Sequence, residues 1–315
     1  MLKPRPLPPG GTVGIAAPSG PVDEVSIHKA AQFLTQRGYR VKLATHLFEA
    51  HGYLAGTDKE RASDMNAMFA DPAVDAIILA RGGYGCARLL DLIDYDLVSQ
   101  NPKPLIGYSD ATALQLALLA RCNLVTFYGP VASIDLAGRS ASMVFGRMLR
   151  ALEARPGARL FSETPASSIE ALSAGQCTGR LIGGCLSVLV SLLGSDYFPD
   201  TRGAILFLED VDEPPYRIDR YLMQLELAGV LSHVAGVLLG RFVRCYPRGG
   251  KPSLSLGDVF KERFAGRLYP VLSGLPFGHI ARKTTVPQGV MCALDTNRGR
   301  IEYAGSCCKM SEGVR

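Results

Sequence analysis

The first 120 or so residues repeat one pattern, in which a short apolar run ends at turn-forming residues and a helical stretch follows. The apolar runs predict buried strands at 12–16, 39–43, 74–80 and 104–106. The stretches between them have helical spacing and predict helices at 24–37, 59–69, 86–92 and 111–120. Repeated strand–turn–helix units are typical of a mostly parallel sheet covered by helices, so we expect an α/β fold.

The periodicity weakens after about residue 132 and returns near residue 175. The second part predicts a glycine turn opening into a helix, strands, a long helix and a final hairpin. These lie at 179–193, 204–208, 216–228, 234–239, 290–294 and 300–303. We therefore expect an N-terminal domain over 1–135, an interdomain connection over 136–173, and a smaller, mixed α/β C-terminal domain over 174–315.

Composition excludes several classes of protein. The chain has 315 residues, 47% of them hydrophobic, and a net charge of +5 without a basic stripe, so we expect no nucleic-acid partner. No apolar stretch approaches the roughly 18 residues of a membrane helix, and prolines interrupt the N-terminus where a signal peptide needs an apolar segment. We expect a cytoplasmic protein with no membrane partner.

The cysteines and histidines give no metal signal. None of the eight cysteines stands in a C-x-x-C pair, and no two of the five histidines have ligand spacing. We expect reduced thiols, no metal and no cofactor.

Ser109 is the first residue that could take part in catalysis. It follows a strand that ends at Gly107 and directly precedes a helix, so its hydroxyl should stand on a sharp turn above the sheet. A helix N-terminus favours developing negative charge there, which suits a nucleophile. Ala111 breaks the full G-x-S-x-G pattern, and the alternative is that Ser109 or Asp110 merely caps the helix.

Two further residues, an acid and a histidine, could act together with Ser109. Glu209 follows the apolar strand at 204–208, although it could belong to a solvated acidic turn. His279 lies in a loop of glycines and a proline that would hold its ring in place, although a lone histidine is often an ordinary residue. A serine needs a base and the base needs an orienting acid, so Ser109, His279 and Glu209 are the residue types of a catalytic triad.

The turn at 81–85 is rich in glycine and follows a strand. Its N–H groups could supply half of an oxyanion hole, because glycine lets the backbone approach a ligand closely. The alternative is the anion turn of a nucleotide- or sugar-phosphate-binding module. Gly83 and Gly85 begin a G-x-G pattern, but Arg88 stands where the dinucleotide fingerprint needs its third glycine.

Eight segments, in order along nearly the whole chain, resemble the LD-carboxypeptidase family of serine peptidases. They are V-G-I-A-A-P-S-G (13–20), Y-L-A-G-T (53–57), A-R-G-G-Y-G-C (80–86), P-L-I-G-Y-S-D (104–110), G-R-L-I-G-G (179–184), L-F-L-E-D-V-D-E-P-P-Y-R-I-D-R (206–220), L-G-R-F (239–242) and G-L-P-F-G-H (274–279). Each segment is modest alone, and the ordered set is specific.

The resemblance implies two domains, with Ser109 on the first and the acid and base on the second. It implies Ser109 as nucleophile, His279 as base and Glu209 as orienting acid, with Glu213 as the rival. The N–H groups of Gly83 and Asp110 would form the oxyanion hole. For substrate binding, Arg81 and Tyr84 are the candidates.

The family acts on murein tetrapeptides in the cytoplasm, releasing D-Ala from L-diaminopimelate or L-Lys for peptidoglycan recycling. A related branch hydrolyses microcin C, and members commonly form homodimers. The resemblance therefore implies a small peptide substrate and a homodimer. Tyr128 stands where the family usually has His, and Cys185 where it usually has Asn. These departures leave the exact substrate open.

Overall fold

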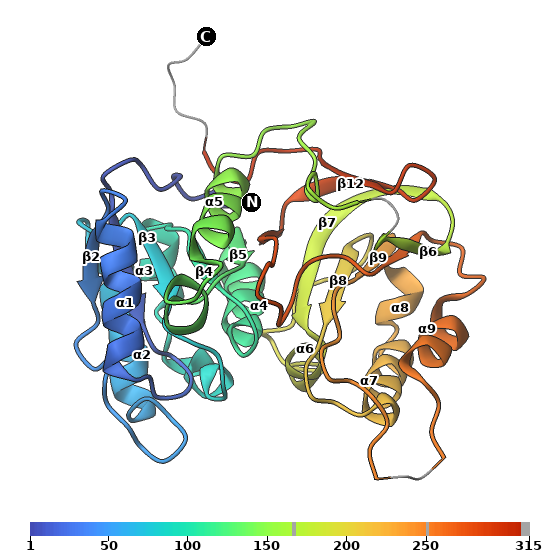
Figure 1. The fold of residues 1–315 in the computed structure, drawn as a ribbon, viewed down its shortest axis with the longest axis horizontal. Coiled ribbons are helices and arrows are strands. Elements are labelled where there is room, and N and C mark those ends of the chain that lie inside the picture. The colour runs from blue at the N-terminus through green and yellow to red at the C-terminus, as the bar shows by residue number, and fades with distance from the viewer. Residues whose placement is uncertain (166–167, 250–251, 310–315) are drawn as a thin grey trace.

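The computed structural model describes residues 1–165, 168–249 and 252–309, and it contains two β-sheets that lie side by side (Figure 1). The first has six strands in the order β11-β5-β4-β3-β1-β2. They are β1 (Thr12–Ala16), β2 (Arg40–Leu43), β3 (Ala76–Leu79), β4 (Leu105–Gly107), β5 (Thr126–Tyr128) and β11 (Val286–Gln288). The first five are parallel, and β11 adds an antiparallel edge. The expected parallel sheet is confirmed.

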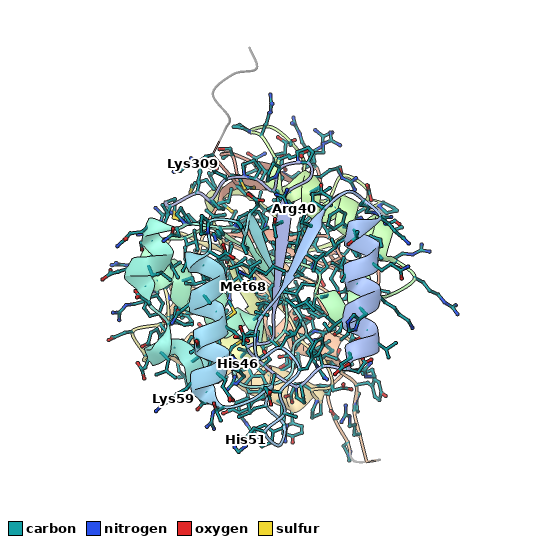
Figure 2. All side chains as sticks on the ribbon, turned by 90° about the vertical axis from the view of Figure 1, so that its left-hand side faces the viewer. Arg40, His46, His51, Lys59, Met68 and Lys309 are labelled. Carbon is teal, nitrogen blue, oxygen red and sulfur yellow. The ribbon has the colours of Figure 1, made fainter. Side chains whose placement is uncertain are left out.

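Helices cover both faces of this sheet. They are α1 (Glu24–Thr35), α2 (Asp58–Ala70), the 3-10 helix η1 (Cys86–Leu92), α3 (Tyr95–Gln100), α4 (Ala111–Cys122), the π-helical turn η2 (Ala132–Leu136) and α5 (Ala141–Leu152). Figure 2 shows α1 and α2 on opposite sides of the strands. Arg40, which opens β2, lies near the top of that view, and His46, which follows β2, lies lower. The carboxyl ends of the parallel strands therefore face the lower edge.

The second sheet has seven strands in the order β13-β12-β7-β8-β9-β10-β6. They are β6 (Glu170–Ser173), β7 (Gln176–Cys185), β8 (Ile205–Glu209), β9 (Gly236–Leu239), β10 (Val271–Ser273), β12 (Met291–Asp295) and β13 (Arg300–Tyr303). Strands β7 to β10 are parallel, and the expected hairpin is formed by β12 and β13. The accompanying helices are α6 (Leu186–Ser191), α7 (Pro215–Leu227), α8 (Val230–His233) and α9 (Leu256–Phe264). The mixed α/β character expected for this part is confirmed.

The glycine turn and helix predicted over 179–193 is wrong in its first half, which is strand β7. The glycines there allow close packing of backbone. A Cβ at Gly183 would lie 1.8 Å from the Phe207 carbonyl oxygen, and one at Gly179 would lie 2.5 Å from the Gly203 oxygen. Glycine at these positions is required by the neighbouring strand and loop, so it does not mark a turn.

Helix α4 joins the two halves. Its residues from Ala111 to Leu119 are all buried, since α4 packs on β4 and β5 on one side and on β7 and α6 on the other (Figure 1). A helix that is buried on all its faces in this way belongs inside a molecule. The N-terminus of α4, where Ser109 lies, is therefore held at the junction between the sheets. Within the described residues, no helix has the length and apolar character to cross a membrane.

Candidate active site

Ser109 stands on the sharp turn that was expected between β4 and α4. Its φ is 68°, in the left-handed region, which costs a non-glycine residue of the order of 1–3 kcal/mol. The side chain lies against the backbone of Gly82, because a Cβ at Gly82 would be 2.9 Å from Ser109 Oγ. The strained turn thus brings the hydroxyl of Ser109 onto the glycine turn that follows β3.

Asp110 does not cap α4 with its side chain, so that alternative is wrong for Asp110. Its carboxylate instead accepts hydrogen bonds from Ser19 Oγ at 2.6 Å and from the Cys86 N–H at 2.8 Å. These bonds tie the turn at 18–20 and the start of η1 to the residue after Ser109.

Arg61 also binds these two turns, although no sequence pattern indicates this role. It is 1% exposed, and its guanidinium donates to the carbonyl oxygens of Pro18 and Gly85. An ion pair with Asp58 completes its contacts. A buried charge is tolerated only when it is paired and hydrogen-bonded in this way.

The two N–H groups proposed for an oxyanion hole are available. Within the described residues, neither the Gly83 N–H nor the Asp110 N–H has an acceptor. Gly83 has φ +127°, and a Cβ there would lie 3.2 Å from the Gly20 nitrogen. Glycine therefore suits the place where this turn approaches Gly20, and among the described residues the N–H of Gly83 has no acceptor.

Glu209 and His279 form a hydrogen-bonded pair in which the acid is buried and the imidazole is partly exposed. Glu209 ends β8 and is 0% exposed, and its Oε2 lies 2.8 Å from His279 Nδ1 and 3.2 Å from the His279 backbone nitrogen. With Nδ1 donating to the carboxylate, Nε2 carries the lone pair that can accept a proton. Glu213, the rival acid, instead contacts Arg217 and Tyr221. The geometry favours Glu209 as the partner of His279.

Tyr128 connects this pair to Ser109. Its hydroxyl donates to Glu209 Oε1 and accepts the backbone N–H of Ser109 at 3.1 Å. Burial, reinforced by the negative charge of Glu209, raises the pKa of Tyr128 well above its ordinary value, so the phenol stays protonated and can donate. The sequence marked Tyr128 as a departure from the family without indicating this role.

Ser109 and His279 approach each other through Tyr108. The ring of His279 packs edge-on against Tyr108, the residue before Ser109, with centroids 4.9 Å apart. In the described part of the chain, no hydrogen bond joins the Ser109 hydroxyl to the His279 ring. The structure therefore joins His279 and Glu209 directly and links Ser109 to them through Tyr128.

A buried cation also contacts the ring of Tyr108. Lys283 Nζ lies 3.7 Å from the centre of the Tyr108 ring and forms an ion pair with Asp135, with both side chains 3% exposed. Burial lowers the pKa of Lys283, although Asp135 opposes the shift. Lys283 thus packs against Tyr108 while its charge is paired with Asp135.

Arg81 and Tyr84, the expected substrate-binding residues, lie at the rim. Arg81 is half-buried and donates to the carbonyl oxygens of Pro21 at 2.9 Å and Gly82 at 3.2 Å. Tyr84 is 51% exposed, and its ring lies 5.8 Å from that of Tyr53, which is also exposed. The rim of the site therefore carries an exposed aromatic pair, formed by Tyr84 of the glycine turn and Tyr53 of the turn at 51–54, together with the partly hydrogen-bonded guanidinium of Arg81.

Thr112 connects Cys185 to the backbone of Ser109. Thr112 Oγ1 donates to the Ser109 carbonyl oxygen at 2.7 Å and accepts the Cys185 N–H at 2.9 Å. Burial, together with Asp210, raises the pKa of the Cys185 thiol well above its usual value, so it remains protonated and inert. Within the described residues, no three His, Cys, Asp or Glu side chains gather as metal ligands would.

Comparison with known proteins gives a consistent result. A family model described as the LD-carboxypeptidase N-terminal domain matches residues 13–129, and the C-terminal domain model of the same family matches 178–294. The chain is 40% identical over 300 residues to a probable murein peptide carboxypeptidase of Bacillus subtilis, covering 93% of this chain and 92% of that protein. It is 34% identical to a murein tetrapeptide carboxypeptidase of Pseudomonas aeruginosa, covering 93% and 96%.

Solved structures are similar as well. The microcin C7 self-immunity protein MccF, in complex with aspartyl sulfamoyl adenosine, superposes with a TM-score of 0.91 at 27% identity. The superposition covers 98% of this chain and 100% of that one. These similarities favour a hydrolase over the phosphate-binding module that the glycine turn left open.

Proposed function

Because this chain belongs to the LD-carboxypeptidase family of serine peptidases, we propose that it is a serine LD-carboxypeptidase of peptidoglycan recycling. Its substrate is a murein tetrapeptide, and it hydrolyses the bond between L-diaminopimelate, or L-Lys, and the terminal D-Ala. The observation that carries this proposal is the pair of buried Glu209 and partly exposed His279, which Tyr128 links to the strained turn of Ser109.

The proposed mechanism is acyl transfer. Ser109 Oγ attacks the carbonyl carbon before D-Ala while His279 Nε2 takes its proton, and Glu209 holds the ring and stabilises the imidazolium. His279 then protonates the D-Ala nitrogen as it leaves, and water hydrolyses the acyl-enzyme in the same way. The hydrogen bond between Ser109 and His279 is expected in the substrate complex, where catalytic hydrogen bonds tighten.

The N–H groups of Gly83 and Asp110 hold the oxyanion in this proposal. Neither N–H has another acceptor in the part of the chain that the structure describes, which supports the assignment, and each such donor contributes on the order of 3 kcal/mol to transition-state stabilisation.

At the rim, Arg81 binds the terminal carboxylate of the substrate. Its Nε and Nη1 donate to carbonyl oxygens, and its Nη2 has no acceptor among the described residues. Tyr84 packs against the peptide. Following the family, we also propose that the protein is a cytoplasmic homodimer and needs no cofactor. Size-exclusion chromatography with light scattering measures its oligomeric state.

Mass spectrometry of the purified protein with L-Ala-γ-D-Glu-meso-diaminopimelate-D-Ala tests the function. The wild type should yield tripeptide and free D-Ala, whereas Ser109→Ala and His279→Ala should fold and yield neither. Turnover by either variant would refute the triad. A folded wild type that leaves the tetrapeptide intact would refute the substrate.

A microcin-type hydrolase with the same triad is the second candidate. The similarity to MccF and the exposed Tyr53–Tyr84 pair, which could stack on a nucleobase, favour it. Incubation with an aminoacyl sulfamoyl adenosine discriminates the two. Cleavage of this compound without cleavage of the tetrapeptide would support the microcin-type activity.

A further inference from the structure

Both backbone polar groups of Ser109 are bonded to buried hydroxyls. The Ser109 N–H donates to Tyr128 Oη at 3.1 Å, and the Ser109 carbonyl oxygen accepts from Thr112 Oγ1 at 2.7 Å. Tyr128 is 1% and Thr112 0% exposed, so water does not compete for either bond. The two hydroxyls therefore bind the peptide groups on either side of the Ser109 Cα, and the Thr112 N–H adds a second bond to the Ser109 carbonyl oxygen, at 3.0 Å.

Each hydroxyl is bonded in turn to the second sheet. Tyr128 donates to Glu209 at the end of β8, and Thr112 accepts the N–H of Cys185 at the end of β7. Cys185 and Glu209 are register partners in the parallel pair of β7 and β8. Ser109 is thus bridged twice to a single rung of the second sheet, and we call Tyr128 and Thr112 the hydroxyl bridges.

The close approach of the sheets is built into the sequence. A Cβ at Gly184 would lie 2.5 Å from Thr112 Oγ1, so only glycine lets β7 reach this hydroxyl. The left-handed conformation of Ser109 is unfavourable and persists only where the surroundings hold it. Two of the bonds that hold it come from groups anchored to the other sheet.

We propose that Tyr128 and Thr112 are positioning residues that keep Ser109 in its strained, reactive conformation only while the two sheets are docked. The proposal rests on the proposed role of Ser109 as nucleophile. On this proposal, the conformation of Ser109 depends on the contact between the two sheets, because the residues that hold its turn are themselves bonded to Cys185 and Glu209 of the second sheet.

Three variants test the hydroxyl bridges by kinetics on the tetrapeptide. Tyr128→Phe and Thr112→Val keep the shape and remove the hydroxyl, whereas Thr112→Ser keeps it. We expect kcat to fall about 10- to 100-fold in Tyr128→Phe and about 10-fold in Thr112→Val, as loss of buried hydrogen bonds predicts. KM should change by less than about threefold, because ground-state binding is untouched. Thr112→Ser should recover most of the loss.

The matched control is Thr126→Val. Thr126 is a fully buried threonine on the same strand as Tyr128, and its Oγ1 has no partner among the described residues. Its kcat should match the wild type. A loss equal to that of Thr112→Val would show that removing any buried hydroxyl here has the same effect, and it would overturn the proposal.

Amide hydrogen exchange, resolved to single residues by NMR, supplies a readout that does not depend on substrate. The Ser109 amide should exchange faster in Tyr128→Phe, and the Cys185 amide faster in Thr112→Val, than in the wild type or Thr126→Val. Unchanged exchange at both amides would overturn the proposal whatever the kinetics. A wild type that cleaves no tetrapeptide would refute the proposed function alone, since the exchange rates still decide this inference.

Discussion

Two glycines lie against the proposed catalytic groups. A Cβ at Gly278 would lie 2.4 Å from Glu209 Oε2, and one at Gly82 would lie 2.8 Å from Ser109 Cβ. Real Cβ atoms do not approach this closely, so any side chain at either position displaces the acid or the nucleophile. Displacements of about 1 Å can cost a hundredfold in rate.

Gly278→Ala tests the placement of Glu209. We expect kcat to fall on the order of 100-fold, because the methyl group pushes the carboxylate from His279. Gly266→Ala is the control: its φ of +74° is also positive, but no atom of the described residues lies within 4 Å of the added Cβ. Gly266→Ala should lose about 1 kcal/mol of stability from backbone strain, and Gly278→Ala should lose more because its methyl group also meets Glu209. Equal kcat in the two variants would contradict the prediction.

The sequence predicts some of these residues and not others. Ser109, Glu209 and His279 each follow a strand or a rigid loop and fall in recognisable segments, so pattern and resemblance identify them. Tyr128 reaches Glu209 across 81 positions, and Lys283 reaches Asp135 across 148. Local patterns carry no information on such pairs, because they depend on how the two sheets meet.

At the scale of elements, the carboxylate of Asp210 joins β8 to α6. It accepts hydrogen bonds from the N–H groups of Ser187 and Val211, each at 2.8 Å. Burial raises the pKa of Asp210 from its usual 3.8 to about 6, although these bonds oppose the shift. The folded protein therefore binds this proton more tightly than the unfolded chain does.

This shift predicts a pH dependence of stability. Between about pH 4 and pH 6 the folded state holds the proton and the unfolded state does not, so the Asp210 contribution to the free energy of unfolding falls as pH rises, by up to about 3 kcal/mol. Urea denaturation of the wild type and of Asp210→Asn across this range measures it. The difference between their unfolding free energies should change with pH, and a constant difference would contradict the shift.

Elements with local signals were predictable, and those defined by distant partners were not. Strands β1 to β4 and helices α1, α2 and α4 follow the alternation of apolar runs. Strand β7 was missed because its glycines serve close packing and resemble a turn. Strand β11 has three residues and is defined by its distant pairing with β5, whose Tyr128 lies opposite Val286.

At the scale of the molecule, one buried ion pair joins distant parts of the chain. Lys283 precedes β11, and Asp135 lies in η2, which follows β5. Breaking such a pair leaves a buried charge without a partner, which costs about 3–5 kcal/mol.

Asp135→Asn should therefore lower the free energy of unfolding by about 3–5 kcal/mol. Adding Lys283→Met should restore most of it, since no unpaired charge then remains. The exposed pair of Asp200 and Arg202 provides the comparison, and Asp200→Asn should change stability by less than about 1 kcal/mol. Urea denaturation measures all three, and equal losses for the two aspartates would contradict the assignment.

The domain boundaries at 135 and 174 remain a prediction. The two sheets agree with two units, but β11 lies within the predicted C-terminal domain by sequence and completes the first sheet.

Strand β11 has a consequence for synthesis of the protein. As the chain leaves the ribosome, the first five strands emerge well before residue 286, and until then β5 is an open edge with Tyr128 unpaired on that side. Glu209 and His279 also emerge after Ser109. Translation order therefore delays completion of the surroundings of Ser109 until the last tenth of the chain, so a nascent or truncated chain lacks the assembled candidate site.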